Sequence, residues 1–295
     1  MNKSERICAG GLGVEDGSSA KQNSTSSLLE ILKDNVKTLT INCDDVLLPQ
    51  VITLGEKIVV FGGRKNPKNP NRNLKIFRAR DCETIYTDDS EVFGVYRSAI
   101  CKVSESSFLC FGGRRSNGNF SNEMYEINVT EADSLSVSSN IIKFEDELPR
   151  LASATCVSIN DSEYEIMGGI KPDGFISQEI FRFKVDGTKG LITWRRSMEF
   201  GIYGHSVYIN GNKMLVIGGI STLHEINDSV IEIDRESWKV RSVKETSSTE
   251  LLLVGNGARV TKDTGSETEI EIIGGGAHCF AFGNHLNPLI STISF

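Results

Sequence analysis

Short runs of apolar residues recur along the chain, and two kinds of run predict two kinds of β-strand. Residues 58–61 and 214–217 are continuously apolar, which is typical of a strand covered on both faces. Residues 124–129 and 180–185 alternate apolar and polar side chains, which predicts strands with one solvent-facing side. The pattern indicates small sheets, each with a buried strand followed by a more exposed one nearer the rim.

A Gly-Gly pair follows an apolar run six times, and successive pairs begin 50 to 56 residues apart. A period of about fifty residues, with several short strands in each unit, is the signature of kelch β-propeller blades. Glycine can adopt positive φ there and let the backbone pass close to the adjacent blade. We therefore expect an all-β fold, a six-bladed kelch-type β-propeller that forms one domain over residues 1–295. The first glycines of the pairs are Gly10, Gly62, Gly112, Gly168, Gly218 and Gly274.

The two ends of the chain do not supply a full set of strands for this ring. Only nine residues precede Gly10, and after Gly275 only residues 289–295 predict a further strand. We expect the first blade to lack its first strand and the last blade its last strand. Because open sheet edges are an aggregation hazard, we infer the C-terminal domain of a longer protein with an N-terminal extension. A ring that closes imperfectly, or a shifted blade assignment, is the alternative.

Composition narrows the class of protein. The net charge of −7 at pH 7 argues against a general affinity for nucleic acid and leaves a local basic patch open. The seven cysteines are scattered without a CxxC spacing, so neither a zinc knuckle nor a redox pair is indicated. Neither a signal peptide nor a membrane span is visible. We expect a soluble, cytoplasmic protein that does not bind a membrane.

The sequence contains no motif for a self-contained active site, and we assign no catalytic residue. Residues 11–17 resemble a nucleotide-binding loop, but the third glycine comes one place too late and no amphipathic helix follows. His205, on an inner strand, is expected to be a structural hydrogen-bonding residue. His278, Cys279 and His285 could supply metal ligands but lack a partner motif, so we expect no metal site.

The loops that follow the glycine pairs are basic, and the connections into the next inner strands are partly acidic. In a four-stranded blade both lie on the same face of the ring. For single residues we favour exposed, salt-bridged loop charges, which contribute little to stability. For the face as a whole we favour a polar docking surface. We also expect residues 18–27 to form a mobile polar loop and residues 66–73 a stiffer basic loop. The charged residues are Arg64, Lys65, Lys68, Arg72, Arg114, Arg115, Lys171, Asp88, Asp89, Glu91, Glu145, Asp146 and Glu147.

Residues 274–288 depart from the ordinary kelch pattern, with a third glycine followed by a Cys-Phe-x-Phe-Gly stretch. This segment resembles the end of the kelch region in the tRNA wybutosine-synthesizing protein 4 family, which is similar to leucine carboxyl methyltransferases. The resemblance covers about fifteen residues; the rest of the chain matches only by its kelch spacing.

The resemblance implies methylation and methoxycarbonylation of a modified guanosine beside the anticodon of tRNA-Phe. S-adenosylmethionine would bind a methyltransferase domain upstream, so we expect no cofactor on this chain itself. The propeller would hold the tRNA. The residues expected to bind substrate are Arg64, Arg72, Arg114, Arg115 and His278.

Two other functions remain open. A kelch protein–protein interaction module, such as a ubiquitin-ligase adaptor or a scaffold, would bind a protein partner on the loop face. It predicts a BTB-type or coiled-coil segment, and the sequence has neither. A stand-alone kelch oxidase or lyase would need metal or cofactor ligands on a loop face, and no convincing set is present.

Overall fold

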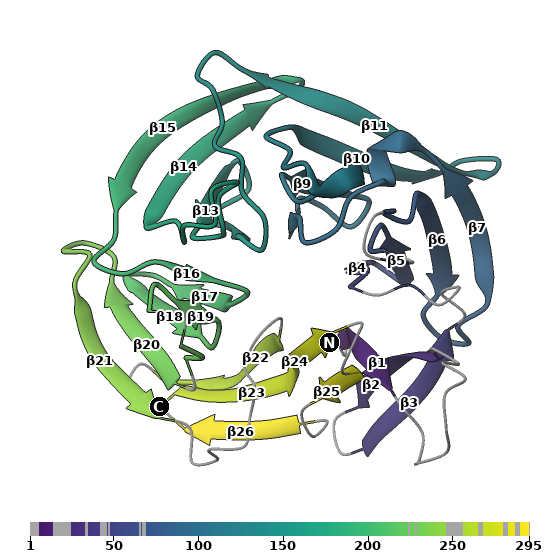
Figure 1. Ribbon diagram of the computed structural model, residues 1–295. Coiled ribbons are helices and arrows are strands. Elements are labelled where there is room, and N and C mark those ends of the chain that lie inside the picture. The colour runs from purple at the N-terminus through teal and green to yellow at the C-terminus, as the bar shows by residue number, and fades with distance from the viewer. Residues whose placement is uncertain are drawn as a thin grey trace.

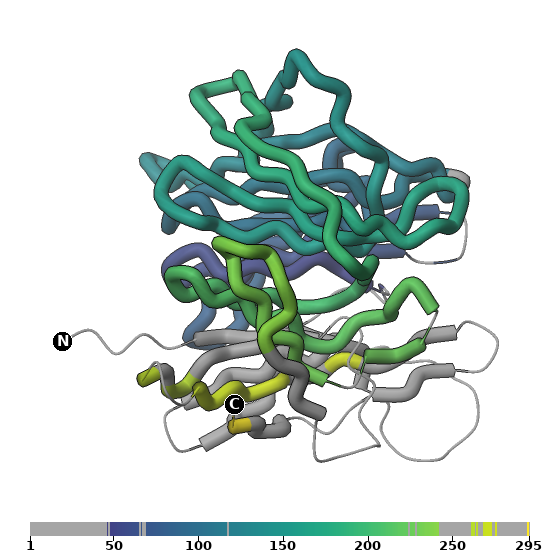
Figure 2. The backbone as a smooth tube through the Cα atoms, turned by 90° about the vertical axis from the view of Figure 1, so that its left-hand side faces the viewer, coloured from purple at the N-terminus to yellow at the C-terminus, as the bar shows by residue number. Residues whose placement is uncertain are grey.

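The described chain is almost entirely without helix, and its strands are arranged in sheets around a central opening (Figure 1). The computed structural model describes residues 6–13, 25–32, 35–41, 46, 48–64, 66, 69–223, 225–227, 229–245, 256–264, 268–279, 283–286 and 290–294. In the side view the turns between strands lie along the two faces of the ring (Figure 2).

Each main sheet is an antiparallel meander whose strands run outward in sequence order. The first sheet comprises β1 (Arg6–Gly13), β2 (Thr25–Leu32) and β3 (Asn35–Ile41). The second comprises β4 (Gln50–Leu54), β5 (Lys57–Phe61), β6 (Asn73–Arg78) and β7 (Thr84–Asp89). An eight-stranded sheet combines two such units: β8 (Ala99–Lys102), β9 (Ser107–Phe111), β10 (Met124–Glu131) and β11 (Leu135–Phe144), then β12 (Thr155–Ser158), β13 (Glu163–Met167), β14 (Glu179–Asp186) and β15 (Lys189–Ser197).

The remaining sheets complete the described part of the ring. One four-stranded sheet comprises β17 (Ser206–Asn210), β18 (Lys213–Ile217), β20 (Ser229–Asp234) and β21 (Val240–Glu245), beside the short pair β16 (Ile202–Tyr203) and β19 (Ile220–Ser221). The last sheet comprises β22 (Asn256–Asp263), β23 (Thr268–Gly274) and β26 (Ile290–Ser294), beside the hairpin of β24 (Gly276–Cys279) and β25 (Gly283–Leu286). The helical residues of the described chain form two single turns, η1 (Glu91–Phe93) and η2 (Ser116–Gly118), too short to cross a membrane.

The propeller predicted from the glycine period is confirmed. The first and last main sheets each contain three strands among the described residues, and β1 contacts β22 and β23. The number of blades stays a prediction. One local expectation was wrong: residues 25–27 belong to β2, where Thr25 and Ser26 pair with the end of β1 and Ser27 pairs with β3. The rest of that predicted loop, residues 18–24, lies outside the described residues.

The hydrophobic core lies between neighbouring sheets. The second strands of three units, β5, β9 and β18, are buried on both faces, as their apolar runs predict. Phe61 of β5 packs against Phe108 of β9, with ring centroids 5.4 Å apart. Further round the ring Phe111 of β9 packs against Phe181 of β14 at 6.1 Å. Burial of apolar area between sheets, rather than within one, therefore stabilises the ring.

The second strand of the remaining four-stranded unit, β13, is half polar in sequence and carries a buried carboxylate. Glu165 of β13 is fully buried and accepts hydrogen bonds from Arg182 Nε at 2.9 Å and Arg235 Nη2 at 2.7 Å. Arg182 lies on the neighbouring strand β14 and Arg235 follows β20 in the next sheet. The ion pair therefore joins two sheets, and a charge buried this deeply requires such partners.

The glycine pairs form the closest contacts between sheets. The first glycines, Gly62, Gly112 and Gly168, have φ of 63°, 65° and 65°. The N–H of the second glycine of each pair donates to a carbonyl just before the next inner strand: Gly63 to Val95 at 2.9 Å, Gly113 to Leu151 at 2.7 Å and Gly169 to Ile202 at 2.8 Å. A Cβ atom on the first glycine would lie 2.2, 2.5 or 2.1 Å from that same carbonyl oxygen. Only glycine fits this contact.

We expect Gly168→Ala to destabilise the ring more than Gly174→Ala. Both glycines have positive φ, so alanine strains the backbone by about 1–2 kcal/mol at either site. The space around Gly174 is open, whereas the new Cβ at residue 168 would collide with Ile202 and force two sheets apart. The free energy of unfolding in urea should fall by about 2 kcal/mol more for Gly168→Ala. If the two variants lose the same free energy of unfolding, the contact between residue 168 and Ile202 does not constrain the spacing of the sheets.

Candidate functional site

Four loops of the same construction follow the glycine pairs. Each is narrowed by a bridge across its base, and each is closed eight residues after the second glycine by an N–H that donates back to that glycine's carbonyl. The bridges are Arg64 to Pro70, Arg114 to Phe120, Ile170 to Ile176 and Ile220 to Ile226. The closing bonds run from Asn71 to Gly63, Ser121 to Gly113, Ser177 to Gly169 and Asn227 to Gly219.

These loops lie on the same face as the connections into the inner strands, as expected. Arg114 pairs with Tyr96 through two backbone hydrogen bonds of 2.8 and 3.0 Å. Ile170 pairs in the same way with Ala152, and Ile220 of β19 with Tyr203 of β16. We call this surface the loop face.

The inner rim of the loop face is a series of residues in the left-handed conformation. Leu48, Arg97, Ser153 and Gly204 each precede an inner strand and have φ between 53° and 67°. Backbone bonds link them around the ring: Ser153 N–H donates to Arg97 at 2.7 Å, and Gly204 N–H to Ser153 at 2.9 Å. The strands that follow these residues are the inner ones of their sheets, next to the central opening (Figure 1).

Three arginines gather at one part of this rim, and we call Arg64, Arg97 and Arg114 the arginine cluster. The Arg64 guanidinium lies 5.2 Å from the ring centroid of Tyr96, and that of Arg114 lies 4.5 Å from that of Phe120. Burial, followed by the charges of Arg114 and Arg64, lowers the pKa of Arg97. The cluster therefore concentrates positive charge in a partly desolvated place.

Two of the arginines predicted to bind substrate form ion pairs with carboxylates of the protein itself. Arg72 forms ion pairs with Asp89 at 3.1 Å and Glu91 at 2.6 Å. Arg115 is paired with Glu123 at 2.8 Å and also donates to the Glu91 carbonyl at 2.9 Å. The expectation of exposed, salt-bridged loop charges holds in part: Arg115 is salt-bridged, but the Arg115 side chain is only 26% exposed. Arg115 is held by its carboxylate, and Arg114 packs on an aromatic ring with a buried Nε atom.

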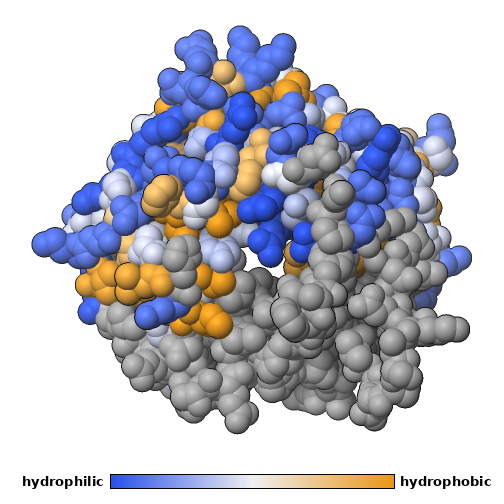
Figure 3. All heavy atoms as spheres, viewed as in Figure 1, coloured by the Kyte–Doolittle hydropathy of each residue, from blue (hydrophilic) through white to orange (hydrophobic). Residues whose placement is uncertain are grey.

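The other side of the loop face is apolar. Phe175, Leu223 and Ile226 are 73%, 75% and 43% exposed, and we call them the apolar patch. In the space-filling view apolar side chains gather over β16 to β20, while hydrophilic ones lie at the upper border of the central opening (Figure 3). The loop face therefore combines a cationic part and an apolar part.

The C-terminal candidates lie elsewhere on the ring. His278 belongs to β24, where it pairs with Asn284 of β25, beside β1 and away from the arginine cluster (Figure 1). His285 pairs with Ala277. Residues 280–282, part of the Cys-Phe-x-Phe-Gly stretch, lie outside the described residues, as do Lys65 and Lys68. Within the described residues no group of three His, Cys, Asp or Glu side chains could hold a metal ion.

His205 does not play the role expected of it. It lies between β16 and β17, and within the described chain its two ring nitrogens have no hydrogen-bond partner. Only its carbonyl accepts, from Thr155 Oγ1 at 2.6 Å. The ring packs at the glycine contact, where a Cβ on Gly168 would come within 3.1 Å of its Cε1 atom. His205 is therefore a packing residue, and its burial lowers its pKa to about 3.

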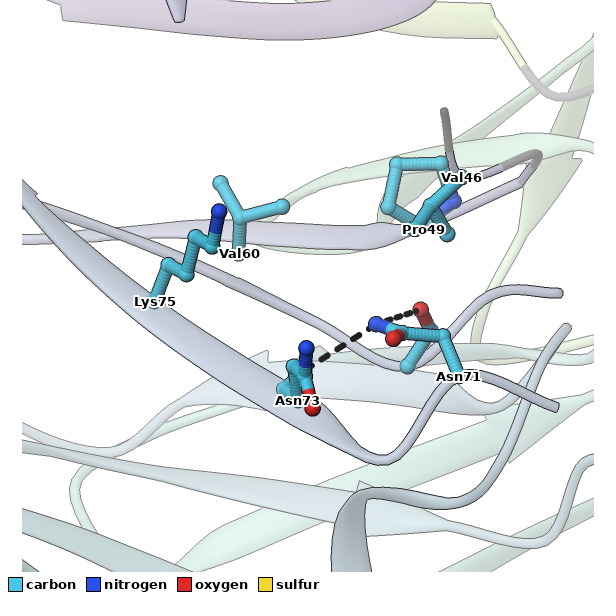
Figure 4. Close-up of a pocket in the computed structure, with 7 residues that line it drawn as sticks. Val46, Pro49, Val60, Asn71, Asn73 and Lys75 are labelled. Atoms are coloured by element: carbon cyan, nitrogen blue, oxygen red, sulfur yellow. Dashed lines mark hydrogen bonds between the residues drawn. The ribbon is translucent and has the colours of Figure 1, made fainter. Parts of the chain in front are cut away.

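A small pocket opens beside the second sheet, lined by Val46, Pro49, Val60, Gly62, Asn71, Asn73 and Lys75 (Figure 4). The Asn71 amide donates to the carbonyls of Gly62 at 2.9 Å and Asn73 at 3.2 Å. Both of its N–H groups are thus used to hold the base of the loop. We therefore assign the pocket to the scaffold of the loop face.

The comparison with protein families gives a match over residues 50–289 to the model "tRNA wybutosine-synthesizing protein 4, beta-propeller". The chain belongs to this family. Relatives named tRNA wybutosine-synthesizing protein 4 include that of Candida glabrata, 26% identical over 250 residues, and that of Saccharomyces cerevisiae, 25% identical over 256 residues. These matches cover 80% and 82% of this chain and 35% of each relative, so the chain spans about a third of their length.

A solved structure supports the fold of this family member independently. The structure of YjhT matches with a TM-score of 0.60 at 12% identity, covering 81% of this chain and 75% of the other. At that identity the likeness concerns the propeller fold alone.

We expect burial of His205 to make stability depend on pH. Its folded pKa of about 3 lies below the unfolded value of about 6.5, so the unfolded chain takes up the proton first. Stability should therefore be lost as pH falls below 6.5, by about 2 kcal/mol at pH 5 relative to pH 7.5. The measurement is urea unfolding of the wild type and His205→Leu at both pH values.

The difference in pH dependence between the wild type and His205→Leu reports the titration of His205 alone. The lowered pKa of Asp234, about 2, affects stability only below its ordinary value of 3.8 and so outside this range. If His205→Leu loses as much stability as the wild type between pH 7.5 and pH 5, the histidine is not buried in its neutral form.

Proposed function

We propose that this propeller takes part in wybutosine synthesis on tRNA-Phe, in the cytoplasm, as the substrate-holding part of a methyltransferase and methoxycarbonyltransferase. The observation that carries the proposal is the family match over residues 50–289. The relatives bear the name of a wybutosine-synthesizing protein, and tRNA is the substrate that this name implies.

The chemistry of the reaction is assigned to another part of the protein. The relatives extend well beyond the region that they share with this chain. S-adenosylmethionine would bind there, in an upstream methyltransferase domain, and the propeller would form a wall of the substrate cleft. In this role the propeller supplies position rather than catalysis, as phosphate contacts do in nucleic-acid complexes.

The charge distribution of the loop face supports this role. A net charge of −7 does not prevent RNA binding when the positive charges are collected on one face. Of the residues proposed to bind substrate, Arg64 and Arg114 belong to the arginine cluster. Arg72 and Arg115 would first have to exchange a carboxylate for a phosphate. His278 would have to act from the hairpin of β24 and β25, which lies beyond the first sheet.

A protein-binding role is the second candidate, and the apolar patch favours it. Exposed large apolar side chains that lie together are typical of interaction surfaces. Phe175 and Leu223 are each more than 70% exposed and come from neighbouring loops. An interaction module would use this patch, and the arginine cluster would then have no RNA to bind.

The gene that encodes this chain should be required for wybutosine. We expect its disruption to remove wybutosine from tRNA-Phe and to leave a precursor that lacks the final methyl and methoxycarbonyl groups. Nucleosides from purified tRNA-Phe are measured by mass spectrometry, and restoring the gene is the control. Unchanged wybutosine after disruption would reject this function in favour of an interaction module.

A further inference from the structure

Most half-buried arginines of the described chain have a carboxylate partner. Arg115 is paired with Glu123, and Arg182 and Arg235 share Glu165. Within the described residues, neither Arg97 nor Arg114 forms an ion pair with any carboxylate. The groups that act on the Arg97 charge are two further arginines and the hydroxyls of Tyr96 and Tyr203. Two partly buried cations are thus left without a counter-charge.

Such an arrangement is costly for the folded protein by itself. A charge removed from water is stable only when it is paired or hydrogen-bonded. The like charges of the cluster repel each other, and the Arg114 Nε atom is buried without a hydrogen-bond partner in the described chain. An anion placed among these groups would remove both costs.

The fold does not require arginine at residue 97. The left-handed conformation recurs at each equivalent position of the inner rim, where Leu48, Ser153 and Gly204 stand. Glycine is the residue that this conformation favours, and a β-carbon there costs about 1–2 kcal/mol. The backbone bond that Arg97 contributes to the rim uses its carbonyl group and not its side chain. The Arg97 guanidinium is therefore not needed to hold the inner rim together.

We propose that Arg97 and Arg114, with Arg64 beside them, bind a phosphate group of the RNA backbone at the inner rim of the loop face. This inference rests on the proposed function, and Arg97 is a residue that the sequence did not suggest. Guanidinium groups bind phosphate in a bidentate manner, and two from different segments hold it from two sides. A phosphate held there would fix the RNA over the central opening.

An RNA phosphate fits this place better than a free anion. The three arginines come from three segments of two neighbouring sheets, so the positive surface crosses a boundary between sheets instead of lining an enclosed cavity. Aromatic rings accompany it: Tyr96 lies under Arg64 and Phe120 under Arg114. A nucleotide chain presents successive phosphates and bases to such a surface, whereas inorganic phosphate would use only part of it.

The test uses the full-length protein purified from the cells that produce it. Its binding to a tRNA-Phe transcript is measured over a series of salt concentrations. Arg97→Gln and Arg114→Gln should each weaken binding about tenfold at low salt. Each should also reduce the slope of log Kd against log salt by about 0.7–0.9, the value for one lost phosphate contact. Arg97→Lys keeps the charge and should keep most of the slope.

Arg80→Gln is the matched control, because Arg80 is 74% exposed and lies in the turn between β6 and β7, on the opposite face. It removes the same charge and should leave both affinity and slope unchanged. Arg97→Gly is a second variant that suits the left-handed backbone, so the unfolding temperature of the unliganded protein should not fall. An unfolding temperature that drops in both Arg97→Gln and Arg97→Gly would assign the arginine to the scaffold and overturn the proposal.

A parallel measurement with inorganic phosphate identifies the source of the anion. If phosphate raises the unfolding temperature of the wild type but not of Arg97→Gln, while tRNA binding is equal in the two, the site takes a free anion and the RNA proposal fails. Equal tRNA affinity and slope in all variants would also overturn it. Neither result affects the disruption experiment, in which loss of wybutosine would still support the proposed function.

Discussion

Contact between a glycine of one sheet and a carbonyl of the next sets the spacing of the whole ring. At Gly62, Gly112 and Gly168 the two backbones approach so closely that a single added carbon does not fit. The adjoining N–H bonds to Val95, Leu151 and Ile202 fix direction as well as distance. Because the aromatic core packs between sheets, its interdigitation depends on this spacing. The loop face in turn takes its shape from the same contacts, since each loop starts at the second glycine of a pair.

Much of the fold could be predicted from the sequence because the sequence pattern repeats from one blade to the next. Glycine pairs at a fixed period and runs such as residues 58–61 report backbone geometry and burial directly. Local departures from this pattern are harder to predict from the sequence. Glu165 stands within a strand that reads as half polar, yet it is fully buried because Arg235, seventy residues away, reaches it from another sheet. A pattern of near neighbours carries no information about such a partner.

The candidate site was only partly accessible to sequence reasoning for the same reason. The basic loops predicted a cationic face, and Arg64 and Arg114 lie on it. That Arg72 and Arg115 are neutralised depends on which carboxylates the turns bring to them, which spacing does not reveal. Arg97 lies in a connection rather than a post-glycine loop. Aligning the repeats would have placed it with Leu48, Ser153 and Gly204 and shown it as the charged member of that series.

The closing bond at the base of each loop separates the scaffold from the loop tip. Once Asn71, Ser121, Ser177 and Asn227 return to their glycines, the residues inside each bridge can change without disturbing the four-stranded sheets. Neighbouring loops already differ in chemistry, from the guanidinium of Arg114 to the exposed phenyl ring of Phe175. Evolution can therefore vary the tips one at a time, as an antibody varies its hypervariable loops on a constant framework. Homologues should accumulate insertions and substitutions between these two anchors while the anchors themselves stay small and polar.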